Sequence, residues 1–367
     1  MRATLVVFLG ACSFTGHSTA IGDVVDGAVD VAPMIDGPPG EFCLGDAMVM
    51  VCLAQMPSMP LAINGMTMID TDAAGQCSPA VVGANANDYC VLAGSSIMFV
   101  GNKPTLSAHG SRPVVLMSAG DIILPGPAAI DMAGHLASAT TAPGGDLCAA
   151  GTPANGSGGG YGGSFGSLGG IGGADAGNNL GGVPSPAIVP QALHGGCGGE
   201  AGLTGGGIAG HGGGAVALLA AGMIQIDGLI DASGGGGGGS KTNNNKGGGG
   251  AGAGGMIVID APTVTGGATA KIVANGGSGG EGSGGMHGKD GNDPPPDPSM
   301  AAPGGAGGST GGDGGFGATG TGLAGVEAGP GLAGTSGAGG GGGGGGVGVV
   351  KAFQNAVLPG MVSPPPS

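Results

Sequence analysis

Short aliphatic runs recur along the chain in a fixed order, and Gly or Pro bounds each run. Three segments begin alike, at residues 113, 215 and 255, and a truncated copy begins at residue 347. Four segments end alike, with an aliphatic residue four positions before a glycine: 106–110, 130–134, 230–234 and 272–276. Apolar positions alternate with polar or small ones, which is the period of a strand with one buried face. Each full copy therefore predicts three short strands and no helix.

This repeat predicts an all-β fold class, an irregular parallel β-solenoid-like stack of short strands. Stacked copies would bury a continuous ladder of Ile, Val, Leu and Ala side chains. The alternative is an antiparallel β-sandwich, which short strands with frequent turns also allow. Long glycine-rich inserts separate the copies, and they are either polyglycine helices packed through backbone contacts or disordered segments.

Shifts in composition divide the chain into seven predicted segments. A lipoprotein signal peptide (1–11) and a lipid-anchored acidic linker (12–42) precede N-terminal β repeats with disulfides (43–136). The remaining segments are a glycine-rich insert (137–213), β repeats (214–276), a second glycine-rich insert (277–346), and a terminal strand with a Pro-rich tail (347–367).

Composition narrows the classes of partner. Glycine accounts for 97 of 367 residues, Trp is absent, and aromatic residues amount to 2%. The chain carries 8 basic and 23 acidic residues, a net charge of −15. Nucleic-acid binding needs basic patches and aromatic stacking platforms, so we expect no nucleic acid as a partner. The acidic surface mainly keeps this low-complexity chain soluble.

The N-terminal sequence is typical of an export signal. Met1-Arg2 precedes an apolar run that ends at Leu9-Gly10-Ala11-Cys12. The run is too short to span a bilayer, but it suits a cleavable signal. The small residues before Cys12 are typical of a bacterial lipobox, so we expect cleavage before Cys12 and lipidation of its thiol. A plain secretory signal that contains Cys12 is the alternative. Ser13, which is not an Asp, permits sorting to the outer membrane.

The remaining cysteines support export, because an even number in an exported chain suggests disulfides. They are Cys43, Cys52, Cys77, Cys90, Cys148 and Cys197. Loop closure favours near neighbours, which predicts the pairs Cys43–Cys52, Cys77–Cys90 and Cys148–Cys197. The sequence contains no Cys-x-x-Cys pair, so we expect no metal site, and no motif implies a cofactor.

Two glycine motifs suggest a serine hydrolase. Residues 162–166 match the G-x-S-x-G nucleophile elbow around Ser164, and residues 211–214 match the H-G-G-G oxyanion motif. Their order is reversed relative to α/β-hydrolases, and Ser164 lies in a glycine-rich stretch rather than between a strand and a helix. A chain with so much glycine produces such matches by chance. We therefore expect no catalytic residues, and a serine hydrolase is a remote alternative.

Other polar residues have structural interpretations. The repeats carry acidic residues without a basic partner nearby in the sequence, which favours a solvated edge over a polysaccharide-cleaving site. These acids are Asp121, Asp131, Asp227, Asp231 and Asp260. Four histidines lie in glycine turns and are expected to face solvent: His109, His135, His194 and His211. Methionines between residues 43 and 100 are expected to fill a core rather than bind copper.

The lipobox, the early cysteine-containing region and four motifs resemble the uncharacterised glycine-rich (PE-PGRS-like) bacterial surface lipoproteins of the myxobacterial type. The motifs are Gly110-Ser-Arg-Pro-Val-Val-Leu, His194-Gly-Gly-Cys197, His211-Gly-Gly-Gly-Ala-Val and Met256-Ile-Val-Ile-Asp-Ala-Pro-Thr-Val. The resemblance covers most of residues 1–363, although the PE-type N-terminal helical domain is missing. The family implies no established activity and supplies no catalytic residues.

These observations predict a non-enzymatic, lipid-anchored cell-envelope protein with a structural or adhesive role. Its expected partners are the membrane, through the N-terminal lipid, and envelope polysaccharide or surface proteins. The expected location is the bacterial cell envelope, anchored in the outer membrane and facing the periplasm or the exterior. A polysaccharide-binding surface module is the alternative, and it would need stacking aromatic rings on one strand face.

Overall fold

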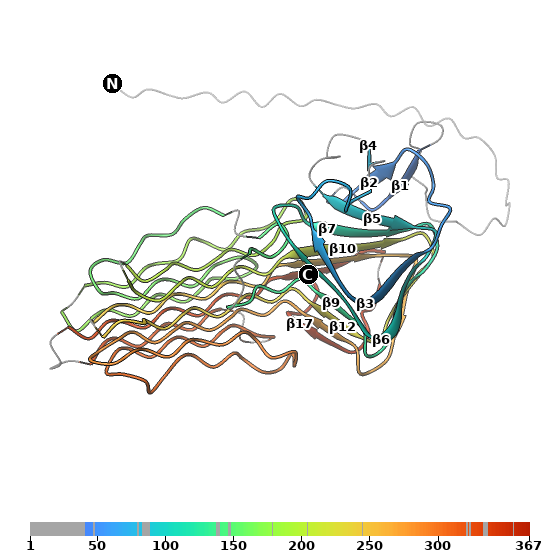
Figure 1. Ribbon diagram of the computed structural model, residues 1–367. Coiled ribbons are helices and arrows are strands. Elements are labelled where there is room, and N and C mark those ends of the chain that lie inside the picture. The colour runs from blue at the N-terminus through green and yellow to red at the C-terminus, as the bar shows by residue number, and fades with distance from the viewer. Residues whose placement is uncertain are drawn as a thin grey trace, which may run out of the picture. The chain divides into compact units, whose positions relative to one another are not determined.

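A computed structural model describes residues 41–367 except 47, 79–80, 83–88, 137–139, 146–147, 178, 204, 244, 321, 323, 333–336 and 355. The described residues all belong to one compact unit. They contain strands and extended segments, and no helix occurs among them. The strands form two mainly parallel sheets and one small antiparallel sheet, and the glycine-rich segments extend away from the parallel sheets (Figure 1).

The first parallel sheet takes one strand from each copy of the repeat. Its order is β16-β13-β10-β7-β5, and every neighbouring pair is parallel. The strands are β5 (Cys90–Gly94), β7 (Val114–Ser118), β10 (Ala215–Ala220), β13 (Met256–Asp260) and β16 (Val349–Ala352). β7, β10 and β13 are buried along their whole length because apolar clusters cover both faces of the sheet. Their sequences are therefore continuous apolar runs rather than alternating ones.

The second parallel sheet branches at the long strand β6 (Ile97–His109), which pairs on one side with β3 (Leu61–Asp70). On the other side, the start of β6 pairs with β8 and its later part pairs with β9. One branch contains β8 (Ile122–Leu124), β11 (Met223–Ile226) and β14 (Thr263–Gly266). The other contains β9 (Ala129–Asp131), β12 (Leu229–Asp231), β15 (Lys271–Val273) and β17 (Met361–Ser363).

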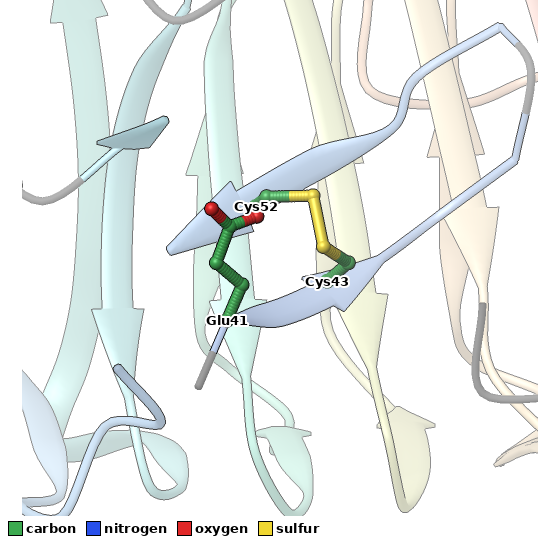
Figure 2. Close-up of side chains that lie close together, drawn as sticks. All are labelled: Glu41, Cys43 and Cys52. Atoms are coloured by element: carbon green, nitrogen blue, oxygen red, sulfur yellow. A yellow bond between two sulfur atoms is a disulfide. The ribbon is translucent and has the colours of Figure 1, made fainter. Parts of the chain in front are cut away.

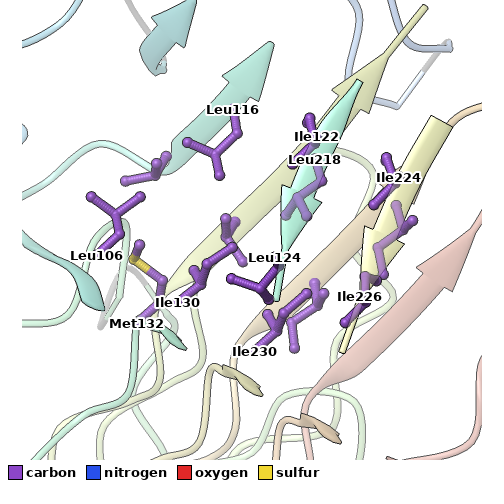
Figure 3. Close-up of a cluster of buried hydrophobic side chains, with 14 of the residues drawn as sticks. Leu106, Leu116, Ile122, Leu124, Ile130, Met132, Leu218, Ile224, Ile226 and Ile230 are labelled. Atoms are coloured by element: carbon purple, nitrogen blue, oxygen red, sulfur yellow. The ribbon is translucent and has the colours of Figure 1, made fainter. Parts of the chain in front are cut away.

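The aliphatic residues that mark the repeat endings lie side by side in the second sheet. Leu106 pairs with Ile130, Ile130 with Ile230, and Ile230 with Ile272. All four side chains are fully buried. They belong to one buried cluster with residues of the first sheet such as Leu116. Figure 3 shows Leu106, Ile130 and Ile230 in this cluster. Equivalent positions of the repeat therefore share one register, and each copy adds one layer to the core.

The predicted fold class needs correction. The strands do not form one parallel solenoid-like stack, because the arrangement is mixed, dominated by parallel pairs, and none of the three sheets closes on itself. The third sheet is antiparallel and contains β1 (Phe42–Leu44), β2 (Val51–Leu53) and β4 (Val81–Val82). The antiparallel sandwich is also wrong, because parallel pairs dominate the other two sheets. A period of two predicts a strand, but it does not say which strand becomes its neighbour.

The glycine-rich segments form a hydrogen-bonded array of backbones. Residues 339–346 lie at its centre. Their N–H groups donate to carbonyls of 157–163, 326–329 and 277–283. Their carbonyls accept from N–H groups of 248–254, 170–173 and 312–318. Residues three apart in the central segment bond the same neighbour, as in an extended helix with three residues per turn. The disordered alternative for the inserts does not fit these described residues.

Glycine is required at the centre of the array because the backbones approach closely. A Cβ added to any residue from 340 to 346 would lie within 3.0 Å of a backbone or side-chain oxygen of a neighbouring segment, a separation that real Cβ atoms do not show. The centre of the array is therefore stabilised by backbone hydrogen bonds and close backbone packing.

Most methionines of the N-terminal repeats do not fill a core as expected, although Met48 packs against one. The large exposed side chains in this region are Met50, Met56, Met59, Met66, Met68 and Met98. On β3 the reason is strand alternation, because Ile63 points inward while residues 62, 64, 66 and 68 are exposed. Ile63 and residues such as Phe99 and Leu106 already occupy the inward positions of β3 and β6.

Candidate functional site

A cavity of about 310 Å³ opens on the glycine-rich array beside the disulfide Cys148–Cys197. Backbone of residues 198–199 and 209–210 forms part of its lining. The polar side chains in the lining are those of Tyr161, Ser164, Ser185 and His211. The cavity is the place where the structure brings residues of the two hydrolase motifs together.

The geometry of Ser164 and His211 does not reproduce a nucleophile elbow. Ser164 is buried, and its hydroxyl accepts a 2.9 Å hydrogen bond from the backbone N–H of Gly169. The segment 197–199 runs between the two motifs, because it lies against Gly163 on one side and bonds Gly210 on the other. Ser164 stands in the glycine array, whereas an elbow needs a strand-to-helix turn, and the described residues contain no helix.

Glu200 positions Tyr161, one of the residues that line the cavity. Its carboxylate accepts hydrogen bonds from the backbone N–H groups of Ala154 (2.9 Å) and Tyr161 (3.2 Å). Burial raises the pKa of this carboxyl, and the two hydrogen bonds act in the opposite direction. The Tyr161 hydroxyl in turn accepts from the N–H of Gly151 at 3.0 Å. These contacts fix the position of the Tyr161 ring in the lining.

The acids of the repeats cap turns and link neighbouring segments. Asp121 accepts from the N–H of Met223 at 2.8 Å, and Asp227 accepts from the N–H of Gly267 at 2.6 Å, so each bridges to the next copy. Asp131 and Asp231 act beside their own strands, where they accept from the N–H groups of Ala133 and Ser233. Asp260 accepts from the side chain of Gln354, which follows the neighbouring strand β16. Asp131 and Asp231 pair in register, and burial raises the pKa of Asp231 to about 6. These contacts give the acids a structural role that the solvated-edge interpretation did not include.

His135 is the centre of a charged cluster at the junction of β9 and the glycine-rich array. Its Nε2 lies 3.5 Å from an oxygen of Asp131, and its Nδ1 lies 3.4 Å from an oxygen of Asp293. Asp293 also accepts from the backbone N–H groups of Leu136 and Gly236. Hydrogen bonds to Asp131 and then Asp293 raise the pKa of His135 to about 10, although partial burial opposes the rise. The imidazole therefore links segments far apart in sequence.

We expect the stability contributed by His135 to fall as pH rises from about 6.5 towards about 10. A histidine whose pKa is raised in the folded state stabilises it fully below the unfolded pKa, and the contribution is lost as pH passes the folded pKa. Denaturant unfolding of the wild type and His135→Gln across pH 6–10 checks this. The difference between the two proteins should shrink with pH. The exposed His287→Gln serves as control, and equal slopes for all three proteins would contradict the assignment.

The other turn histidines also have contacts. His194 stacks on the buried Phe165 ring, with centroids 5.7 Å apart. His109 lies 3.9 Å from the carboxylate of Asp70, its partner across the sheet. His211 lines the cavity. The expectation that these side chains simply face solvent is therefore too simple.

Three disulfides connect the six described cysteines in the expected pairs: Cys43–Cys52, Cys77–Cys90 and Cys148–Cys197. The first joins directly opposed residues of β1 and β2. Both cysteines of the last disulfide line the cavity. Cys12 lies outside the described residues, as do the predicted signal peptide and nearly all of the predicted linker.

One group of potential metal ligands lies beside the first disulfide. Ligand atoms of Glu41, Cys43 and Cys52 are within 4.8 Å of one another (Figure 2). Both sulfurs belong to the disulfide, however, and a metal ligand must be a thiolate. In the oxidised protein this group therefore offers a cation only the exposed Glu41 carboxylate.

Comparisons with known proteins identify no relative of this chain. No protein-family model matches it, and no curated protein or solved structure shows significant similarity. Within the described part of the chain, no helix has the length and hydrophobicity needed to cross a bilayer. Function must therefore be argued from the residues themselves.

Proposed function

We propose that the protein is a non-enzymatic, lipid-anchored component of the bacterial cell envelope with a structural or adhesive role. The observation that carries the proposal is the glycine-rich array. Its central segment bonds surrounding segments on all sides, and residues 340–346 of that segment leave no room for a Cβ. Such an array is suited to a stiff spacer that keeps an adhesive surface at a fixed distance from the membrane.

The proposed location rests on the cysteines. Three disulfides are typical of oxidising compartments outside the cytoplasm. The sequence Leu9-Gly10-Ala11-Cys12 supplies the proposed lipidation site, and Ser13, which is not an Asp, permits sorting to the outer membrane. The protein would face the periplasm or the exterior, with the membrane as one partner and envelope polysaccharide or surface proteins as others.

Neither alternative function has comparable support. For the serine hydrolase, Ser164 and His211 share a cavity but lie on either side of segment 197–199. For the polysaccharide-binding module, Phe316 is the one exposed Tyr, Phe or Trp among the described residues, and it lies outside the strands. A stacking platform normally uses several such rings, so the described strand faces lack the expected recognition surface.

Mass spectrometry of the N-terminal peptide tests the anchor. Wild type and Cys12→Ala would be produced in a Gram-negative host and separated into membrane and soluble fractions. We expect the wild type to begin at Cys12, to carry acyl chains on its thiol and to sediment with outer membranes, because more than one chain gives stable anchoring. The Cys12→Ala protein should lose the lipid. A mature wild-type protein that is soluble and without lipid would refute the proposal.

A further inference from the structure

Two methionines on β3 are unusually exposed for their residue type. The Met66 side chain is 90% exposed and that of Met68 is 68% exposed, whereas methionines such as Met117 and Met132 of this chain are fully buried. Methionine is among the residues most often found in protein interiors. The exposed pair lies on a regular part of β3, where residues 66–70 pair continuously with residues 105–109 of β6.

The two thioethers share one face of the sheet. Residues two apart in a strand point to the same side, with Cα atoms about 6.6 Å apart. Each methionine side chain has three rotatable bonds, so the two sulfurs can approach a common ion without a change in the backbone. Asp70 continues the same face, and His109 on β6 lies 3.9 Å from its carboxylate. The face therefore presents two soft sulfur donors next to a carboxylate and an imidazole.

Among the described residues, methionine thioethers are the sulfur ligands that remain for a metal ion. All six described cysteines are in disulfides, so their sulfurs are not free thiolates. Thioethers stay available in an oxidising compartment, and with thiolates they are the ligands that select Cu(I) among metal ions. Hard cations such as Mg²⁺ and Ca²⁺ prefer oxygen ligands and gain little from methionine. A nearby negative charge from Asp70 favours a cation at this face.

We propose that Met66 and Met68 form a surface site for a soft monovalent cation, Cu(I), for which Ag(I) is the stable analogue. The two sulfurs coordinate the ion, and the carboxylate of Asp70 supplies a favourable field beside it. The site requires no conformational change in β3 or β6, and it lies apart from the cavity at Cys148–Cys197. It does not depend on the proposed envelope function or on the lipid anchor.

Metal titration of the disulfide-bonded protein tests the site. Ag(I) binding would be measured by calorimetry in chloride-free buffer, and Cu(I) binding by anaerobic competition with bicinchoninate. We expect Met66→Leu/Met68→Leu to weaken the tightest site at least tenfold. The matched control Met98→Leu/Met361→Leu also removes two exposed thioethers, from strands β6 and β17, and should bind as the wild type does.

Circular dichroism and the relative affinities of the variants decide the result. Unchanged circular dichroism of both double variants is expected, because the substituted side chains are at least partly exposed, and it shows that lost binding is not lost folding. Equal affinity of the wild type and Met66→Leu/Met68→Leu would overturn the proposal. So would an equal loss in the two double variants, because binding would then depend on the number of methionines and not on this pair.

Discussion

Replacing Gly344 by Ala is expected to lower the free energy of unfolding by at least about 3 kcal/mol. Gly344 lies in the central segment of the array, where its N–H donates to Val326 and its carbonyl accepts from Gly170. An added Cβ would lie within 3.0 Å of the backbone carbonyl of Phe316. A flexible side chain could move away from this contact, but a hydrogen-bonded backbone cannot do so without breaking its own bonds. The methyl group must therefore separate neighbouring segments.

Gly177→Ala is the matched control for this experiment. The nearest heavy atom to an added Cβ there is a side-chain oxygen of Asp175 at 3.4 Å, which is an ordinary contact. Its effect should stay within about 1 kcal/mol and can be stabilising, because alanine restricts the unfolded chain. Denaturant unfolding of both variants, with the disulfides intact, measures the difference. Similar stability of Gly344→Ala and Gly177→Ala would show that the array tolerates a methyl group and is not close-packed.

The sequence predicted the layers of the core better than the arrangement of the sheets. The shared spacing of Ile130, Ile230 and Ile272 identified equivalent positions, and these residues do pair in register. The antiparallel pairing of β1 with β2 and the branching of the second sheet at β6 were missed. Hydrophobic periodicity reports which face of a strand is buried, whereas partner choice depends on contacts between segments far apart in the chain.

The polar sites were harder to predict for a related reason. Loop closure gave the disulfide pairs, because each joins neighbouring cysteines along the sequence. The contact between His135 and Asp293 joins residues separated by more than 150 positions, and no local pattern indicates it. The exposure of Met66 and Met68 was also missed. The alternation along β3 indicated it, because both methionines lie on the opposite face of the strand from the apolar Ile63. Within the glycine-rich segments, one isolated acid, Glu281, gave no signal of its role.

Glu281→Gln is expected to lower the free energy of unfolding by about 2–4 kcal/mol, although the substitution preserves size and shape. The Glu281 carboxylate is fully buried in the array. One oxygen accepts from the N–H of Ser309 at 2.7 Å, the other accepts from the N–H of Lys289 at 2.9 Å, and the N–H of Gly308 lies within 3.0 Å of both. The carboxylate thus joins the loop at 308–309 to residue 289. A glutamine amide would place an NH₂ group against an N–H donor in either orientation, which leaves buried donors without an acceptor.

Glu327→Gln separates this effect from the simple loss of a negative charge. Glu327 is exposed, so its neutralisation should change stability by no more than about 0.5 kcal/mol. Amide hydrogen exchange provides the local measurement, because the N–H groups of Lys289, Gly308 and Ser309 should exchange faster in Glu281→Gln than in either the wild type or Glu327→Gln. If those amides keep their protection and unfolding is unchanged, the carboxylate does not hold this loop. Glu281 would then have no structural role, and the complete burial of its carboxylate among backbone N–H donors would need a different explanation.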